Sequence, residues 1–291
     1  MTNVLGQGAR LPGCGRSERV MLIKLGDRDA LHKRYIAAKP YPFARIDGLL
    51  DQAFAETVAA AYPSLETALE SGRTFKTVNE RKKVQITDSR LFPEPVAKLS
   101  EALASPEFLA DLSYITGIPD LLADAELVGG GIHVTGPGGR LDVHVDFNYM
   151  EQRKLHRRIN LLLYLNPVWE EQWGGQIQLW DKDVRKCEQA FPPALNRCVI
   201  FETSDISFHG VTPVSAAAPF PRLSFATYYY TKEPPPHWNG ISHSTIFKAR
   251  PDERLRKYVL MPTEALQQRL TSGISRIRRG VRKLTGRQPS R

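Results

Sequence analysis

The second half of the chain consists of short apolar runs separated by glycine, proline and asparagine. Seven β-rich runs follow one another from Ala125, with turn signals between them, and Gly136–Gly139 reads as a hairpin turn. This texture predicts an all-β sandwich or barrel, and a double-sheet jelly roll fits it. The predicted strands are Leu127–Thr135, Arg140–Asp146, Arg158–Leu165, Gln176–Trp180, Arg197–Phe201, Ser207–Val214 and Arg222–Thr231.

The first half has the longer period of helices. A strand over Tyr41–Leu50 leads into a helix over Gln52–Ala61, with Asp51 as its N-cap and Pro63 after its end. Apolar residues at three- and four-residue spacing predict two further helices. The chain is therefore expected to be mainly β with flanking helices (α+β), a helical layer covering the sheet. The further segments are Phe75–Ile86, read as extended, and the helices Pro93–Ala104 and Glu107–Thr116.

Composition shifts divide the chain into four parts. The Gly-, Arg- and Lys-rich start is read as an N-terminal extension with one short helix over Asp27–Ala38, and Asp252–Leu260 predicts another helix near the other end. The predicted parts are the extension 1–40, a main domain 41–235 with its jelly-roll core at about 125–232, a C-terminal extension 236–264 and a tail 265–291.

The tail 265–291 has the clearest amphipathic pattern in the chain. Six aliphatic residues from Leu266 to Leu284 recur at steps of three or four, and arginine and lysine fill the other face. Such a helix suits an anionic membrane interface or a partner contact. It could equally pack its aliphatic stripe on the protein's own helical layer. Gly273 and Gly280 weaken the helix by roughly 1 kcal/mol each, which favours packing.

Charge and cysteine content narrow the function classes. The net charge of the 291 residues is +9, but eight basic residues and no acidic ones follow Glu264, which leaves about +1 for the rest. A nearly neutral body argues against nucleic-acid binding by the main domain. The three cysteines have no metal-like spacing, and no apolar run approaches a membrane span. A cytoplasmic protein, at most peripheral at a membrane, is expected.

The candidate chemistry lies on four of the predicted strands. His144 and Asp146 are two residues apart on a strand, so they point to one face. With His209 they give the two histidines and one carboxylate of a facial triad, which holds non-haem Fe(II) and leaves positions open. A hydrogen-bonded pair at a strand end is the alternative for the first two residues, and a surface histidine is the alternative for His209.

Arg222 and Ser224 also share one face of their strand, toward the predicted barrel interior. A buried arginine is costly unless paired, and a ligand carboxylate would pair with it bidentately while Ser224 adds a hydrogen bond. Tyr164, on the strand face that carries Asn160, could donate to the same carboxylate. An ion pair with Glu202 is the alternative for Arg222, and a core position is the alternative for Tyr164.

At this point the sequence resembles the Fe(II)/2-oxoglutarate-dependent dioxygenases, specifically the prolyl-4-hydroxylase-like branch. The resemblance covers roughly Ala125–Lys232, with weaker similarity over Tyr41–Ala61. It is carried by His144-Val145-Asp146, Tyr164-Leu165-Asn166, Trp169, Gly174-Gly175, His209, and Arg222 with Ser224.

The resemblance implies a double-stranded β-helix core, jelly-roll and cupin-like, with iron on His144, Asp146 and His209. It implies that Arg222, with Ser224 and Tyr164, holds 2-oxoglutarate, and that O2 is consumed with ascorbate in a supporting role. Some members carry a tyrosine on the preceding strand. This chain has His133 and Thr135 there, so the contacts of His133 or Asn160 with 2-oxoglutarate stay open.

The implied reaction is hydroxylation of an unactivated C–H bond in a prolyl, peptidyl or small-molecule substrate, with release of succinate and CO2. The competing class is a non-catalytic binding protein that retains the barrel. The stretch Phe147–Arg158 reads as a loop, either a solvated basic face or a lid that recruits an anionic or peptidyl substrate.

Overall fold

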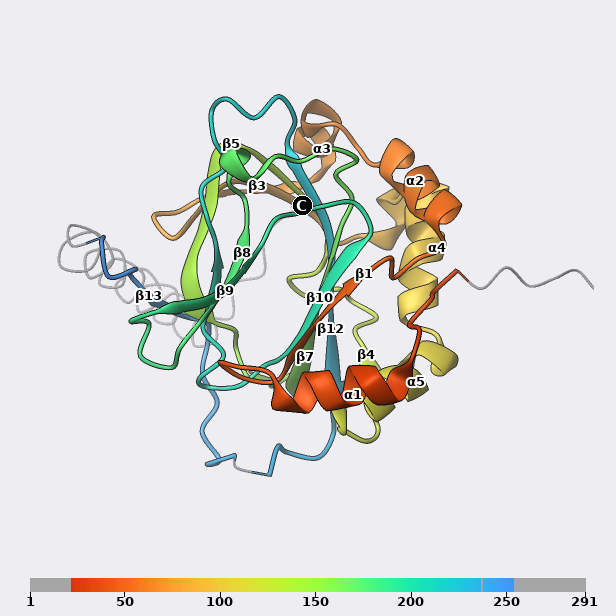
Figure 1. Cartoon of the computed structure of the whole chain (residues 1–291), viewed down its shortest axis with the longest axis vertical. Coiled ribbons are helices and arrows are strands. Elements are labelled where there is room, and N and C mark those ends of the chain that lie inside the picture. Colours follow the sequence, from red (N-terminus) through yellow and green to blue (C-terminus); the bar gives the residue numbers. More distant parts are fainter. Residues whose placement is uncertain (1–21, 237, 254–291) are drawn as a thin grey trace, which may run out of the picture.

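The computed structural model describes residues 22–236 and 238–253 (Figure 1). All but the first two residues of the predicted helix over Asp252–Leu260, and the whole tail 265–291, lie outside the described residues. Among those described, no helix is long and apolar enough to cross a membrane. The α-helices are α1 Arg28–Ala37, α2 Gln52–Ala61, α3 Leu65–Ser71, α4 Glu94–Leu103 and α5 Pro106–Thr116, and the short 3-10 helices are η1 Ser89–Leu91 and η2 Glu171–Trp173.

Four of the five α-helices in the described residues begin at a residue whose side chain caps them, and α4 begins after Pro93 without such a cap. The carboxylate of Asp51 accepts from the amide of Phe54 at the start of α2, as its sequence predicts. Ser105 caps α5 in the same way, and Gly117 ends it with a left-handed backbone. Helix α3, with Ser64 as its N-cap, is absent from the sequence prediction. The helices gather on one side of the strands in Figure 1.

The described strands form one 13-stranded sheet with antiparallel pairing, curled into a double-stranded β-helix, so the predicted fold is confirmed. Its main path runs β1-β10-β7-β12-β5-β11-β8-β9. The strands are β1 Phe43–Asp47, β2 Arg73–Lys76, β3 Glu80–Ile86, β4 Leu122–Ala123, β5 Gly131–Val145, β6 Tyr149–Met150, β7 Leu155–Tyr164, β8 Ile177–Trp180, β9 Cys187–Phe191, β10 Arg197–Glu202, β11 His209–Val211, β12 Arg222–Thr231 and β13 Ile246–Lys248.

Strand β7 shows why helices cover one face of the sheet. Leu161 and Leu163 are fully buried in the core cluster shared with the helices, whereas Leu162 and Tyr164 belong to a second cluster inside the barrel. Both faces of this strand are therefore apolar, which is why its sequence is a nearly continuous hydrophobic run. Leu161 and Leu163 therefore pack outward against the helices.

The predicted hairpin turn at Gly136–Gly139 is wrong. The stretch lies inside the single strand β5, and both of its flanks pair with β3: Thr135 lies opposite Lys83 and Arg140 opposite Arg81. The four residues are therefore an irregular insertion in one strand. Glycine is needed because a Cβ at Gly139 would lie 2.4 Å from the side chain of Thr135.

Candidate active site

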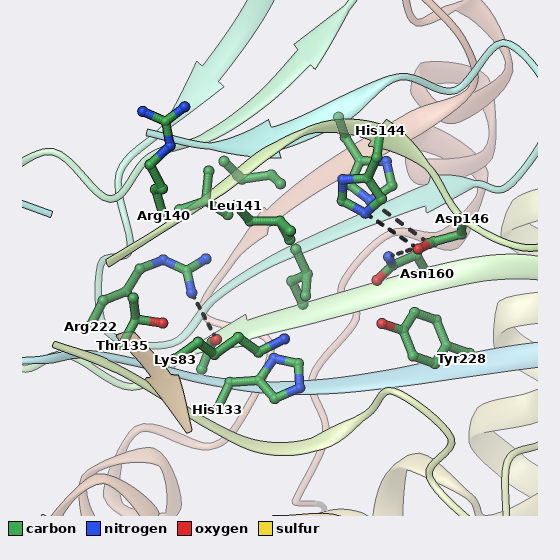
Figure 2. Close-up of a pocket in the computed structure, with 15 residues that line it drawn as sticks. Lys83, His133, Thr135, Arg140, Leu141, His144, Asp146, Asn160, Arg222 and Tyr228 are labelled. Carbon is green, nitrogen blue, oxygen red and sulfur yellow. Dashed lines mark hydrogen bonds and ion pairs between the residues drawn. The ribbon is translucent and has the colours of Figure 1, made fainter. Parts of the chain in front are cut away.

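Two histidines and one aspartate meet at the end of β5. His144 lies directly opposite His209 of β11, and Asp146 comes directly after the last residue of β5. Nε2 of His144 is 3.4 Å from Oδ1 of Asp146, and Nε2 of His209 is 3.7 Å from Oδ2 (Figure 2). One donor atom from each residue lies within 4.8 Å of the others, and all three residues are buried. The structure thus brings together the three residues that the sequence singles out as ligands.

A bulge in β5 aims His144 into the barrel. His209 pairs with His144 but Val211 pairs with Leu141, so β5 carries one more residue than β11 between the two pairs. Leu141 and His144 therefore both line the inner pocket, which a regular pleat would forbid. Gly210 permits the bulge, because a Cβ there would lie 3.0 Å from the backbone of Val143.

Both ligand histidines are held by backbone carbonyls. Nδ1 of His144 is 2.9 Å from the carbonyl oxygen of Asp142, and Nδ1 of His209 is 2.9 Å from that of Ser207. When each Nδ1 donates its proton to the carbonyl, the lone pair of each Nε2 is available to a metal that Asp146 also binds. Burial, followed by the neighbouring His144, lowers the pKa of His209 to about 4. That imidazole is neutral near pH 7, as a metal ligand must be.

Asp146 is ionised despite its burial. Burial alone would raise the pKa of its carboxyl, but the nearby Arg157 and the two histidines hold that pKa well below its usual range. NH1 of Arg157 lies 3.3 Å from Oδ2 of Asp146, and Nδ2 of Asn160 donates to the same oxygen at 3.2 Å. Asn160 therefore faces the carboxylate of the cluster.

Arg157 is the residue that the sequence prediction missed. The stretch Phe147–Arg158 was expected to be a loop, but β7 already begins at Leu155 and Arg157 is 2 % exposed. Its guanidinium carbon lies 3.7 Å from the ring centroids of both Phe147 and Tyr228. The two predicted roles of this stretch, a solvated basic face and a lid over the substrate, do not describe Arg157. It is a buried cation stacked between two aromatic rings.

Two of the three predicted cosubstrate residues, Arg222 and Ser224, line the other end of the inner pocket, away from the His144–Asp146 pair (Figure 2). Arg222 donates through Nε to the carbonyl of Gly175 and through NH1 to Oγ of Ser224. It forms no ion pair with Glu202 or with another carboxylate of residues 22–253 that the structure describes. His133, which also lines the pocket, contacts the carbonyl of Gly129 through Nε2.

The hydroxyl of Tyr164 is available to donate a hydrogen bond to a ligand. Its hydroxyl is buried and has no hydrogen-bond partner among the described residues, and the Arg222 guanidinium carbon lies 4.9 Å from its ring centroid. Burial raises its pKa to about 12, although Arg222 opposes the shift. An unsatisfied buried hydroxyl beside an unpaired arginine fits a ligand carboxylate. The donor set therefore fits 2-oxoglutarate, as the cluster of His144, Asp146 and His209 fits iron.

A second, larger cavity lies on the other side of the cluster. It has a volume of about 640 Å³ and is bounded by the β2–β3 hairpin, by β13 and by the stack around Arg157. His144 and Asp146 line both this cavity and the inner pocket. A metal on the cluster would therefore face both the small inner pocket and the larger cavity.

Comparisons with known proteins identify the class. Residues 130–230 match the family model of the 2OG-Fe(II) oxygenase superfamily. The chain is 36% identical over 78 residues to prolyl 3-hydroxylase OGFOD1 of Mus musculus; the match covers 25% of this chain and 14% of that protein, so the chain spans about one seventh of its relative's length.

Two solved structures share the fold. A Pseudomonas putida prolyl-4-hydroxylase has a TM-score of 0.52 and 16% identity, and the match covers 71% of this chain and all of that one. A Trichoplax adhaerens prolyl hydroxylase, in complex with a hypoxia inducible factor peptide fragment, has a TM-score of 0.50 and 18% identity over 70% and 88% of the two chains.

Residues 130–230 are therefore identified as a 2OG-Fe(II) oxygenase domain, and the described chain has the fold of the prolyl hydroxylases. Fe(II) and 2-oxoglutarate are the cofactor and cosubstrate that this family implies, and the histidine–aspartate–histidine cluster lies within the matched residues. The domain is that of a 2-oxoglutarate-dependent dioxygenase.

Proposed function

We propose that the protein hydroxylates an unactivated C–H bond of a prolyl, other peptidyl or small-molecule substrate, with release of succinate and CO2. One observation carries the proposal: His144 and Asp146 form part of the wall between a pocket that ends at Arg222 and a cavity of about 640 Å³. Cosubstrate and substrate can thus approach the same metal from separate chambers.

The roles of the residues follow from their geometry. His144, Asp146 and His209 would hold Fe(II), which, when bound with 2-oxoglutarate, supplies the oxidising chemistry. Arg222 and Ser224 would bind the far carboxylate, and Tyr164 would satisfy its free hydroxyl by donating to it. The apolar wall of Leu162, Ile177 and Val211 would keep water away from that end.

The outer cavity supports a peptidyl substrate, which is a further part of the proposal. Its volume admits several residues, and its walls combine the rings of Phe75, Phe147 and Phe247 with the cations of Arg73 and Lys83. Lys83 is paired with Glu80 at 2.9 Å, so Arg73 is the cation that would favour a substrate with an acidic group. The peptide complex of the Trichoplax adhaerens enzyme agrees with a peptidyl substrate.

Succinate formation tests the function. Full-length protein is incubated with Fe(II), 2-oxoglutarate and ascorbate, alone and with prolyl peptides that differ only in flanking acidic residues. We expect succinate in excess of the peptide-free background, and a peptide product heavier by one oxygen atom. A protein that binds 2-oxoglutarate but never releases succinate would instead be a binding protein that retains the barrel.

We also propose that the tail 265–291 gives the protein a peripheral contact with anionic membranes in an otherwise cytoplasmic location. The proposal rests on its segregated aliphatic and basic residues. Flotation with anionic and neutral liposomes tests it, on the full chain and on a chain that ends at Glu264. Equal recovery of both chains in the soluble fraction at low salt would refute it.

A further inference from the structure

The segment after the barrel returns to the metal cluster. Strand β13 pairs with the end of β5, so Phe247 lies directly opposite His144. The two ring centroids are 5.3 Å apart and the ring planes are inclined by 34°. His209 has its own neighbour, Phe201 of β10, at 4.6 Å. The ring of His209 is therefore supported by Phe201 from within the barrel, and the ring of His144 is supported by Phe247 from the C-terminal segment.

Arg250 anchors this segment to both strands at the bulge. It is 8 % exposed, and its NH2 donates to the carbonyl of Val211 on β11 at 3.2 Å and lies 3.5 Å from that of Leu141 on β5. Its Nε donates to Oε1 of Gln178 on β8. Three neighbouring strands are thus joined by one side chain.

The same arginine belongs to a buried network of alternating charges. Arg140 contacts Asp142 at 2.5 Å and Glu253 at 2.7 Å, and Arg250 lies 3.6 Å from Asp142 and 3.8 Å from Glu253. Asp142 is fully buried. A buried carboxylate is tolerated only when paired, so this network ties the side chain of Asp142 to the C-terminal segment.

Asp142 is also the residue that orients His144. Its carbonyl oxygen is the partner of Nδ1 of His144, and it lies within the bulge that turns His144 inward. Its side chain is held by Arg140 and Arg250, while its backbone holds the imidazole. Movement of the bulge would therefore change the direction of Nε2, and the C-terminal segment restrains that movement.

We propose that Phe247 and Arg250 are positioning residues that fix the iron ligand His144, Phe247 by packing on its ring and Arg250 by bracing the bulge beneath it. The inference rests on the proposed function, since it assumes a metal on the cluster. Partners of metal-ligating histidines are worth about 10- to 100-fold in metal affinity. The effect falls on His144, because His209 is oriented by Ser207 and Phe201 within the barrel.

The test compares the full-length wild type with two full-length variants, Phe247→Leu and Arg250→Met. Each variant keeps an apolar side chain of similar size, but the first removes the aromatic ring and the second removes the guanidinium group. Phe247→Tyr retains the ring and serves as the conservative rescue. Ile246→Ala, on the same strand and 45 % exposed, is the matched control. Mn(II) affinity is measured by the free-ion signal in electron paramagnetic resonance, and thermal unfolding is followed without metal.

Proton NMR of the Co(II)-loaded protein reports each ligand separately, because the Nδ1 protons of His144 and His209 give distinct shifted, exchangeable signals. We expect Phe247→Leu and Arg250→Met to weaken Mn(II) binding by about tenfold or more, and to broaden one of the two signals through faster exchange. Phe247→Tyr and Ile246→Ala should leave both signals and the affinity unchanged.

Two outcomes overturn the inference. Unchanged Mn(II) affinity in both variants would show that the segment does not position the ligand, and equal broadening of both signals would show a general loosening of the barrel. Failure of the proposed function has another signature, since the wild-type chain would then bind no metal or would bind it without forming succinate. Phe247→Leu keeps an apolar side chain in place, so the result stands even if Arg250→Met does not fold.

Discussion

Replacement of Arg157 by methionine should affect the metal-free and metal-loaded protein differently. Methionine fills a similar space between Phe147 and Tyr228 but leaves Asp146 without its cation. At 3.3 Å and an effective dielectric constant of about 20, the lost attraction is about 5 kcal/mol. Breaking a buried ion pair costs roughly 3–5 kcal/mol, so we expect a loss of about that size in the free energy of unfolding without metal.

A bound divalent ion gives Asp146 another positive partner. The substitution also removes the repulsion between the Arg157 cation and that ion. The loss should therefore be smaller when metal is bound. By linkage, the difference between the two losses equals the gain in metal-binding free energy. If metal restores about 2 kcal/mol, Arg157→Met should bind Mn(II) about 30-fold more tightly than the wild type.

Urea unfolding in chelator and in saturating Mn(II), with Mn(II) binding measured independently, tests this thermodynamic cycle. The unfolding slopes must agree between variants for the free energies to be comparable. Arg185→Met is the control, because Arg185 is 83% exposed and its pair with Asp183 is a surface contact at 3.8 Å. An equal loss of stability with and without metal, and unchanged Mn(II) affinity, would refute the proposed role of Arg157.

Three further predictions concern other parts of the site. Arg222→Ala should raise the KM for 2-oxoglutarate by 30-fold or more, from the loss of a contact worth roughly 2–4 kcal/mol; an unchanged KM would place the carboxylate elsewhere. Gly210→Ala should lower both the melting temperature and Mn(II) affinity, because its Cβ would lie 3.0 Å from Val143; a wild-type melting curve would contradict the bulge geometry. Burial raises the pKa of Tyr164 in the folded protein to about 12, above the ordinary value of about 10. The stability that the protonated hydroxyl contributes is therefore complete below about pH 10 and is lost as the pH rises toward 12. The melting temperature of Tyr164→Phe should therefore fall less steeply above pH 10 than that of the wild type. Parallel curves for the two proteins would argue against a raised pKa of Tyr164.

The alternation of side chains along the strands was enough to predict most of the site. Arg222 and Ser224 line the pocket from one face of β12, and His144 of β5 and Asp146, just after that strand, line it from the other side of the site. These pairs are two residues apart, and a two-residue period survives wherever the strand is regular. The outward leucines of β7 follow from the same rule.

Irregular strands explain what the sequence could not show. On β7, regular alternation from Asn160 would place Arg158 inside the barrel. Tyr229 pairs with Ile159 and Tyr230 with Arg157, so a bulge skips Arg158 and turns Arg157 inward. A bulge depends on pairing with a strand that is distant in the sequence, so the local pattern of residues does not predict it.

Short edge strands were the other omission. Strand β13 has only three residues and follows a proline-rich stretch, so its sequence carries no periodic signal. Its place is set by the pairing of Phe247 with His144 and by the charges around Arg250. Such contacts depend on tertiary structure, which is why a segment that read as an extension contributes to the wall of the site.

Metal-dependent succinate formation by the wild type and by Asp146→Asn, at equal protein concentration, tests the assignment of the site most directly. Asparagine is preferable to alanine because it keeps a side-chain oxygen near the buried Arg157. We predict that the wild type binds one equivalent of Fe(II) and converts 2-oxoglutarate to succinate. The folded Asp146→Asn protein should bind Fe(II) weakly and form no succinate. Equal metal binding and equal succinate formation by the two proteins would contradict an iron site at His144, Asp146 and His209.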